Sequence, residues 1–130
     1  MRLVVRALAA LALPLLVAGC PGDPDIAVVQ DEVFSLSCAF SSCHGSSGSG
    51  ELELTDADTS LAELIDVESH EVAGEVRVIP GDSANSLLFK LLEGPVGGAD
   101  QMPPSSGSVE VSVTQDQLDL VRDWIDAGAL

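Results

Sequence analysis

The chain has 130 residues, of which 21 are acidic and five are basic, and its formal net charge at pH 7 is −16. An excess of negative charge on this scale excludes electrostatic attachment to nucleic acid or to anionic lipid. It favours a partner with a basic surface, or simply a well-solvated surface. Aromatic residues make up only 3% of the sequence, so rings contribute little of the buried area of a core.

The first twenty residues combine a short basic region with an apolar run. Arg2 and Arg6 precede the apolar residues 7–17, which are too few to cross a bilayer and are typical of a secretory signal. The run ends in Val-Ala-Gly-Cys at 17–20, which resembles the lipobox of bacterial lipoproteins. This resemblance implies a signal peptide over residues 1–19 and a lipid-modified Cys20 that anchors the protein in a membrane. The alternative is an ordinary secretory signal with a chance cysteine.

The remaining chain divides into a tether and one small domain. Residues 20–25 form a short linker rich in proline and aspartate, and residues 26–130 have the length of a single domain. All 21 acidic residues follow Cys20, and the basic residues of this part are Arg77, Lys90 and Arg122. Because Pro21 rather than aspartate follows Cys20, lipoprotein sorting implies the bacterial cell envelope, at the outer membrane facing the periplasm.

The pattern of apolar residues predicts an all-α domain of about four short helices with long loops and minor extended segments. Helical spacing after Asp25 predicts a first helix that runs into Cys38. The expected inner face of this helix consists of Ile26, Val29, Val33 and Leu36. Residues 45–50 are a loop of glycine and serine, and residues 51–55 are expected to be extended. Ser60 and Glu63 have the spacing of a capping box, which predicts the start of a second helix.

Two further helices are predicted in the second half. Asp82 or Ser83 can cap a third helix, which Gly94 ends. Its apolar residues are Leu87, Leu88, Leu91 and Leu92. Residues 94–108 form a loop that contains Met102, and brief extended segments are expected at 76–79 and 109–113.

The last helix has the clearest pattern. Thr114 and Gln117 form a capping box at its start, and Gly128 ends it. Its inner face consists of Leu118, Val121, Trp124 and Ile125.

Two cysteines and a histidine lie close together after the first helix. Cys38 and Cys43 enclose four residues, and His44 follows directly. If Cys20 carries a lipid, Cys38 and Cys43 remain as a pair of cysteines, and an exported protein rarely keeps two nearby thiols free. The pair could form a disulfide, attach a haem with His44 as iron ligand, or join His44 and His70 in a zinc site. A haem would also help to fill a core that has few aromatic rings.

Several pieces of the sequence occur in the order found in class I c-type cytochromes. They are Cys43-His44-Gly45, Arg77-Val78-Ile79-Pro80-Gly81 followed by Ser86-Leu87-Leu88, Met102-Pro103-Pro104, and Asp123-Trp124-Ile125-Asp126-Ala127-Gly128-Ala129. Residues 26–129 therefore resemble this family, and in particular the small cytochrome c-like domains of bacterial lipoproteins. The departure from the family is the spacer between the cysteines, which has four residues here instead of the usual two.

The resemblance implies a haem c, with its iron, attached through Cys38 and Cys43. It implies that His44 is the proximal iron ligand and Met102 the distal one. His70 is an alternative distal ligand or an exposed histidine. Arg77 pairs with a haem propionate or is a solvated surface charge. The first and last helices are expected to cross, with Trp124 packed in their contact.

The function implied is electron transfer by a lipid-anchored haem protein that is not itself an enzyme. Its partners would be a redox protein, for which the acidic surface suits a basic docking surface, and the membrane, but not nucleic acid. One alternative is a non-haem structural or binding lipoprotein of cytochrome-like fold with a Cys38–Cys43 disulfide. Another is a haem sensor or peroxidase-like domain with an open iron site, which requires that Met102 does not bind.

Overall fold

The computed structural model describes residues 22–105 and 111–130. The predicted signal peptide, Cys20 and the first two positions of the extended segment expected at 109–113 lie outside the described residues. Among the described residues, none of the helices combines the length and the apolar character that crossing a bilayer requires.

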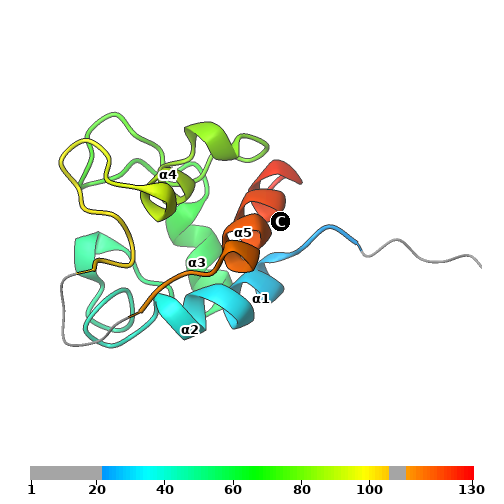
Figure 1. Ribbon diagram of the computed structural model, residues 1–130, viewed down its shortest axis with the longest axis horizontal. Helices are drawn as coiled ribbons and strands as arrows, with labels where there is room; N and C mark the ends of the chain where they lie inside the picture. Colours follow the sequence, from blue (N-terminus) through cyan, green and yellow to red (C-terminus); the bar gives the residue numbers. More distant parts are fainter. Residues whose placement is uncertain (1–21, 106–110) are drawn as a thin grey trace, which may run out of the picture.

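Four helical stretches form the described part of the domain, which confirms the predicted small, mainly α-helical fold (Figure 1). The first stretch consists of α1 (Ile26–Val29), a π-helical turn (Gln30–Phe34) and α2 (Ser35–Ser37). The other three are α3 (Ala57–Leu64), α4 (Leu87–Glu93) and α5 (Gln115–Asp126). Two 3-10 turns lie at Ser49–Glu51 and Ser83–Asn85.

Extended pairing in the described residues is limited to isolated bridges, without a sheet. Val78 pairs with Ile65 and Val76 pairs with Glu68, so residues 76–79 lie beside the chain that leaves α3. The predicted extended segment at 76–79 is therefore present as two single bridges.

The π-helical turn changes which side of the first helix faces the core. Leu36, expected on the inner face, is 57% exposed, whereas Phe34 and Ser37 are buried. A π-helical turn contains an extra residue, so the side chains that follow it are rotated relative to a regular 3.6-residue spacing. The prediction for Leu36 was wrong for this reason, while Val29 and Val33 are buried as expected.

Helix α3 begins earlier than its predicted capping box. Asp56 is the N-cap, and its carboxylate accepts a hydrogen bond of 2.9 Å from the backbone N–H of Thr59. Ser60 lies inside the helix, where it is buried and donates a hydrogen bond of 2.7 Å to Oε1 of Gln30. The prediction that Ser60 opens the helix was wrong, because Asp56, an equally favourable N-cap residue, lies four residues before it and already caps the helix.

Helices α4 and α5 end where glycine was expected to end them. Gly94 is the C-cap of α4, and Gly128, just past the end of α5, has a φ of +112° that favours glycine. The predicted capping box at the start of α5 is confirmed. There, Thr114 accepts from the backbone N–H of Gln117, whose side chain accepts from the N–H of Thr114.

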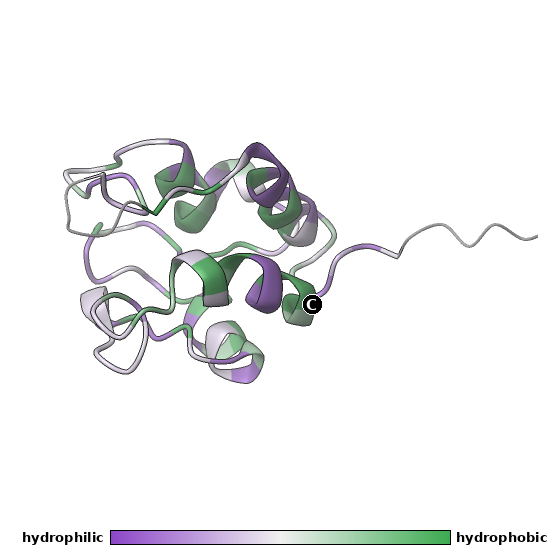
Figure 2. Cartoon of the chain, turned by 60° about the horizontal axis from the view of Figure 1, so that its bottom comes forward, coloured by the Kyte–Doolittle hydropathy of each residue, from purple (hydrophilic) through white to green (hydrophobic). Residues whose placement is uncertain are grey.

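The hydrophobic core lies among the first helix, α3, α4 and α5, whose apolar faces turn inward (Figure 2). The first helix contacts α3 and α5, and α4 contacts α5. The two ends of the domain meet in this region. The carbonyl of Leu130 accepts hydrogen bonds from the N–H of Ile26 (2.8 Å) and from the indole of Trp124 (3.2 Å). The chain between these ends forms the loops that hold the candidate site.

Candidate functional site

A cavity of about 510 Å³ lies among the loop after the first helix, helix α4 and the loop that contains Met102. These loops occupy the same side of the molecule, at the left of Figure 1. The apolar part of the lining consists mainly of Leu52, Leu54, Leu64, Leu87, Leu88, Leu91 and Leu92. The cavity is also bordered by every residue predicted to bind haem: Cys38, Cys43, His44, Arg77 and Met102. Pockets for cofactors usually measure about 300–1,000 Å³, so its size suits one.

The four-residue spacer between the cysteines is folded into a turn. The N–H of Cys43 donates to the carbonyl of Phe40 (2.8 Å), and the N–H of His44 donates to the carbonyl of Cys38 (3.1 Å). Phe40 is 39% exposed at this turn. The extra length is taken up by the turn, so both cysteines and His44 border one cavity.

Position 45 requires a glycine, because the backbone of the spacer between the cysteines approaches it closely. Its N–H donates to the carbonyl of Phe40 (3.0 Å), and the residue is buried. A Cβ atom at this position would lie 2.7 Å from the carbonyl oxygens of both Ala39 and Phe40, closer than real contacts allow. The glycine that follows His44 is therefore dictated by backbone packing.

The two thiols have different surroundings. Cys38 packs against the core, and its burial, with a further contribution from Cys43, raises the pKa of its thiol to about 12. The sulfur of Cys43 lies 3.8 Å from the hydroxyl of Ser42 at the exposed side of the loop. Cys38 is consequently a neutral thiol at physiological pH.

His44 presents one ring nitrogen to the protein. Its Nδ1 lies 3.3 Å from the carbonyl oxygen of Leu52. Because a carbonyl can only accept, this hydrogen bond places the proton on Nδ1 and leaves the lone pair on Nε2 available to a ligand. The carbonyl of His44 also accepts a hydrogen bond from the N–H of Leu54 (2.6 Å). The main chain and the side chain of His44 are therefore both hydrogen-bonded to residues 52–54.

Met102 lies in a loop that is tied to the end of helix α4. Its N–H donates to the carbonyl of Leu91 (2.8 Å), and the side chain of Gln101 donates to the carbonyl of Leu92 (3.0 Å). The last carbonyls of a helix have no partner within the helix, so the loop satisfies them. These bonds keep the half-buried Met102 at the cavity.

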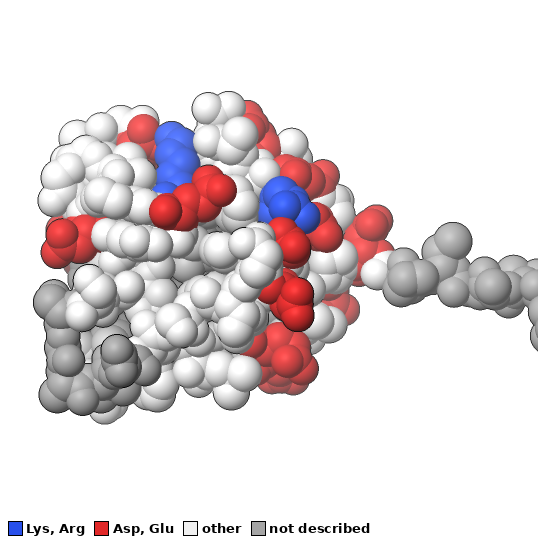
Figure 3. All heavy atoms as spheres, in the orientation of Figure 1, with Lys and Arg blue, Asp and Glu red and all other residues white. Residues whose placement is uncertain are grey.

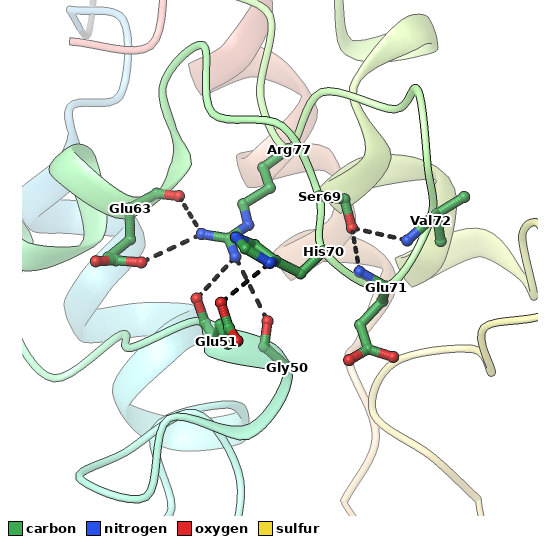
Figure 4. Close-up of polar contacts among 8 residues, drawn as sticks. All are labelled: Gly50, Glu51, Glu63, Ser69, His70, Glu71, Val72 and Arg77. Atoms are coloured by element: carbon green, nitrogen blue, oxygen red, sulfur yellow. Dashed lines mark hydrogen bonds and ion pairs between the residues drawn. The ribbon is translucent and has the colours of Figure 1, made fainter.

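Arg77 borders the cavity, and its guanidinium is also hydrogen-bonded to other parts of the protein (Figure 4). The residue is 6% exposed. One terminal nitrogen donates to the carbonyl and the carboxylate of Glu63, at 2.8 and 3.2 Å. The other donates to the carbonyls of Glu51 (2.7 Å) and Gly50 (3.4 Å). Arg77 is thus a buried, multiply bonded residue rather than a solvated surface charge.

His70 does not border the cavity. Its side chain is 62% exposed, and its Nδ1 lies 3.0 Å from the carboxylate of Glu51. Within residues 22–105 and 111–130, no three side chains of His, Cys, Asp or Glu gather as a metal site. The alternative zinc site of Cys38, Cys43, His44 and His70 therefore lacks its ligand geometry.

The site includes groups that sequence reasoning did not assign to it. The half-buried side chains of Leu88 and Leu91, predicted only as apolar residues of this helix, line the cavity, and Leu88 also packs against the core. The helical spacing of the leucines contained a signal for them, because the four leucines form one broad apolar face of the helix. The carbonyl of Leu52 had no such signal, since any residue type supplies a backbone oxygen.

The basic residues of the described domain are all paired with acids. Arg77 pairs with Glu63, Lys90 with Glu75, and Arg122 with Asp119 and Asp123. Figure 3 shows most of the acidic side chains of one face along its right-hand part, with a few near its centre and its left and upper edges. The acidic residues without such partners give the surface its negative charge.

No protein-family model matches this chain, and it has no significant similarity to the curated proteins or to the solved structures.

Proposed function

We propose that this protein is a haem c electron-transfer domain, anchored to the bacterial outer membrane through Cys20 and facing the periplasm. The observation that supports it is the gathering of Cys38, Cys43, His44 and Met102 around one leucine-lined cavity. These residues come from two separate loops, and each has the chemistry that haem attachment or iron ligation requires.

The residues around the cavity suit this cofactor. Cys38 and Cys43 supply the two sulfur atoms for thioether bonds, and the turn between them absorbs the longer spacer. His44 keeps its Nε2 available, because its Nδ1 is held by the carbonyl of Leu52. Met102, from the loop that follows α4, would supply a thioether sulfur. When bound, the haem iron would supply one-electron exchange between Fe(III) and Fe(II).

The residues around the cavity would set the reduction potential of the iron. Neutral imidazole and thioether ligands favour the reduced state and raise the potential. Leucine side chains around the cavity exclude water and lower the local dielectric, which strengthens this preference. Arg77 borders the same cavity, and its pairing with a propionate stays a prediction.

The surface of the domain supports a redox protein as partner. Its unpaired acidic side chains would attract a protein with a basic docking surface and repel nucleic acid. Such attraction weakens as the ionic strength rises. The lipid on Cys20 would keep the domain at the membrane where its partner is found.

The test is to express the full chain with a cytochrome c maturation system and to record its absorption spectrum and its intact mass after denaturation. We expect a Soret band and the added mass of one covalent haem. The Cys38→Ser and Cys43→Ser variants are each expected to keep haem through one thioether, and the double variant to lose covalent haem. Ser42→Ala, in the same loop and also at the cavity, is the matched control and should keep haem.

Two results would contradict the proposal in different ways. A protein without a Soret band and lighter than its reduced mass by two hydrogens would be the disulfide-linked lipoprotein of the alternative interpretation. A haem protein that binds carbon monoxide readily when reduced would have an open iron site, which favours a sensor or peroxidase-like domain.

A further inference from the structure

The segment 50–54 supplies the carbonyl that orients His44. Within it, the carbonyl of Leu52 faces Nδ1 of His44 at 3.3 Å, and the N–H of Leu54 donates to the carbonyl of His44 at 2.6 Å. The carbonyl of Leu54 in turn accepts from the buried amide of Gln30 at 2.9 Å. The far end of the segment is therefore fixed to the first helix, and the orientation of His44 depends on how the near end is held.

The near end is held by Arg77. One nitrogen of its guanidinium donates to the carbonyls of Glu51 and Gly50, directly before Leu52, and the other donates to Glu63 on α3 (Figure 4). The backbone of Arg77 is itself fixed, because its N–H donates to Val67 (2.8 Å) and its carbonyl accepts from Leu88 (2.9 Å). The side chain of Arg77 thus connects α3 to the segment 50–54, and the backbone of Arg77 is itself held in place by hydrogen bonds.

The local conformation of the segment requires such a hold. Glu51 has a φ of +53°, in the left-handed region that residues with a Cβ rarely adopt, and it follows Gly50 at +67°. A strained residue of this kind persists only when its surroundings hold it. Arg77 holds the carbonyl of Glu51, and His70 pairs with its exposed carboxylate. The hydrogen bond from Arg77 therefore stabilises the left-handed conformation of Glu51, directly before Leu52.

We propose that Arg77 is a positioning residue for His44, which acts by holding the segment whose Leu52 carbonyl receives the His44 Nδ1–H. The consequence for the iron rests on the proposed haem function, whereas the effect on the His44 ring does not. Lysine cannot replace Arg77 in this position. A planar guanidinium donates to Glu63 and to Glu51 at once, whereas an ammonium group cannot span both.

The test uses the full chain labelled with ¹⁵N-histidine, in whichever form it is purified. The ring Nδ1–H of His44 is followed by NMR, in the reduced state if haem is present, and His70→Gln assigns the two histidines. We expect its exchange with solvent to be roughly two- to tenfold faster in Arg77→Lys, the change that follows the loss of one ordinary hydrogen bond. Arg77→Met is expected to give at least the same effect.

Lys90→Met is the matched control. Like Arg77→Met, it removes one cation and breaks one ion pair, that of Lys90 with Glu75, but Lys90 does not border the cavity. We expect Lys90→Met to leave the Nδ1–H exchange unchanged. If haem is attached, Arg77→Lys should also raise the reduction potential, because a weaker hydrogen bond makes His44 a less basic ligand. This variant keeps the charge, so the shift cannot come from a lost cation.

Equal exchange in the wild type and in a folded Arg77→Lys variant would overturn the proposal, as would an equal change in Lys90→Met. If neither Arg77 variant folds, the wild-type chain still decides, because a neutral His44 with its proton on Nε2, or an unprotected Nδ1–H, contradicts it. A missing Soret band counts only against the haem function, since the ring of His44 can be observed without haem.

Discussion

The ring of Phe34 meets the ring of Trp124 edge to face, with centroids 6.4 Å apart and ring planes at 85°. Both side chains are fully buried, Phe34 from the first helix and Trp124 from α5. Edge-to-face pairs bring the positive edge of one ring to the negative face of the other. This contact therefore joins the first and last helices of a domain that contains few other rings.

Stability should depend strongly on this pair. We expect Trp124→Ala to lower the free energy of unfolding by about 3–5 kcal/mol, the usual cost of removing a buried aromatic side chain. Phe34→Leu should have a smaller effect in the same direction, because it keeps most of the buried volume but loses the ring contact. Urea unfolding followed by circular dichroism measures both.

Leu36 provides the matched control on the same helix. It is 57% exposed, so Leu36→Ala should change the free energy of unfolding by no more than about 0.5 kcal/mol. A Leu36→Ala variant as unstable as Phe34→Leu would mean that the helix continues regularly through residues 30–34 and buries Leu36.

Gly45 should be needed for the geometry of the attachment loop. In Gly45→Ala, the added Cβ would lie 2.7 Å from two backbone oxygens of the spacer, so the turn between the cysteines must open. We expect a lower melting temperature and, under the proposed function, a lower yield of covalent haem, measured from the Soret absorbance per mole of protein. Gly94→Ala is the control, because a Cβ there meets nothing within 4 Å and its φ of 176° is extended. Equal losses in both variants would contradict this role of Gly45.

The sequence allowed the number and order of the helices to be predicted, because capping and helical spacing are local properties. The capping box of Thr114 and the glycine stops at Gly94 and Gly128 needed no tertiary information. The inner position of Leu36 was wrong because the π-helical turn before it shifts the spacing. That turn has no simple sequence signature, so regular periodicity could not reveal it.

The sequence identified the side chains that border the cavity but not the backbone groups around them, and that these side chains bind a haem stays a prediction. Cys38, Cys43, His44 and Met102 could be named because their chemistry is specific, and one cavity contains them all. The hold of Arg77 on the carbonyls before Leu52 could not be foreseen. It depends on long-range packing between loops about 26 positions apart, which neither composition nor spacing records.

Stability should also depend on pH through Asp56. Hydrogen bonds from the backbone N–H and the hydroxyl of Thr59 lower the pKa of this carboxyl in the folded protein. A carboxyl with a lowered pKa stabilises the fold above its unfolded pKa of about 3.9, and this contribution is lost as the pH falls through the folded pKa. We expect Asp56→Asn to melt at a lower temperature than the wild type near pH 7, and the difference to shrink below about pH 4. A difference in melting temperature that stays constant between pH 3 and 7, by thermal unfolding, would show that the charge of Asp56 does not contribute.

Met102, rather than His70, should supply the sixth iron ligand of the haem-loaded protein. Met102 borders the cavity and its N–H is fixed to the carbonyl of Leu91, whereas His70 is exposed and pairs with Glu51. Under the proposed function, Met102→Ala should lose the weak far-red absorption band of methionine-ligated haem and bind carbon monoxide when reduced. Met102→His should keep a six-coordinate iron with a lower potential, because imidazole stabilises Fe(III) better than a thioether does. His70→Gln should leave the spectrum and the potential unchanged, and loss of the band in that variant instead would assign the sixth position to His70.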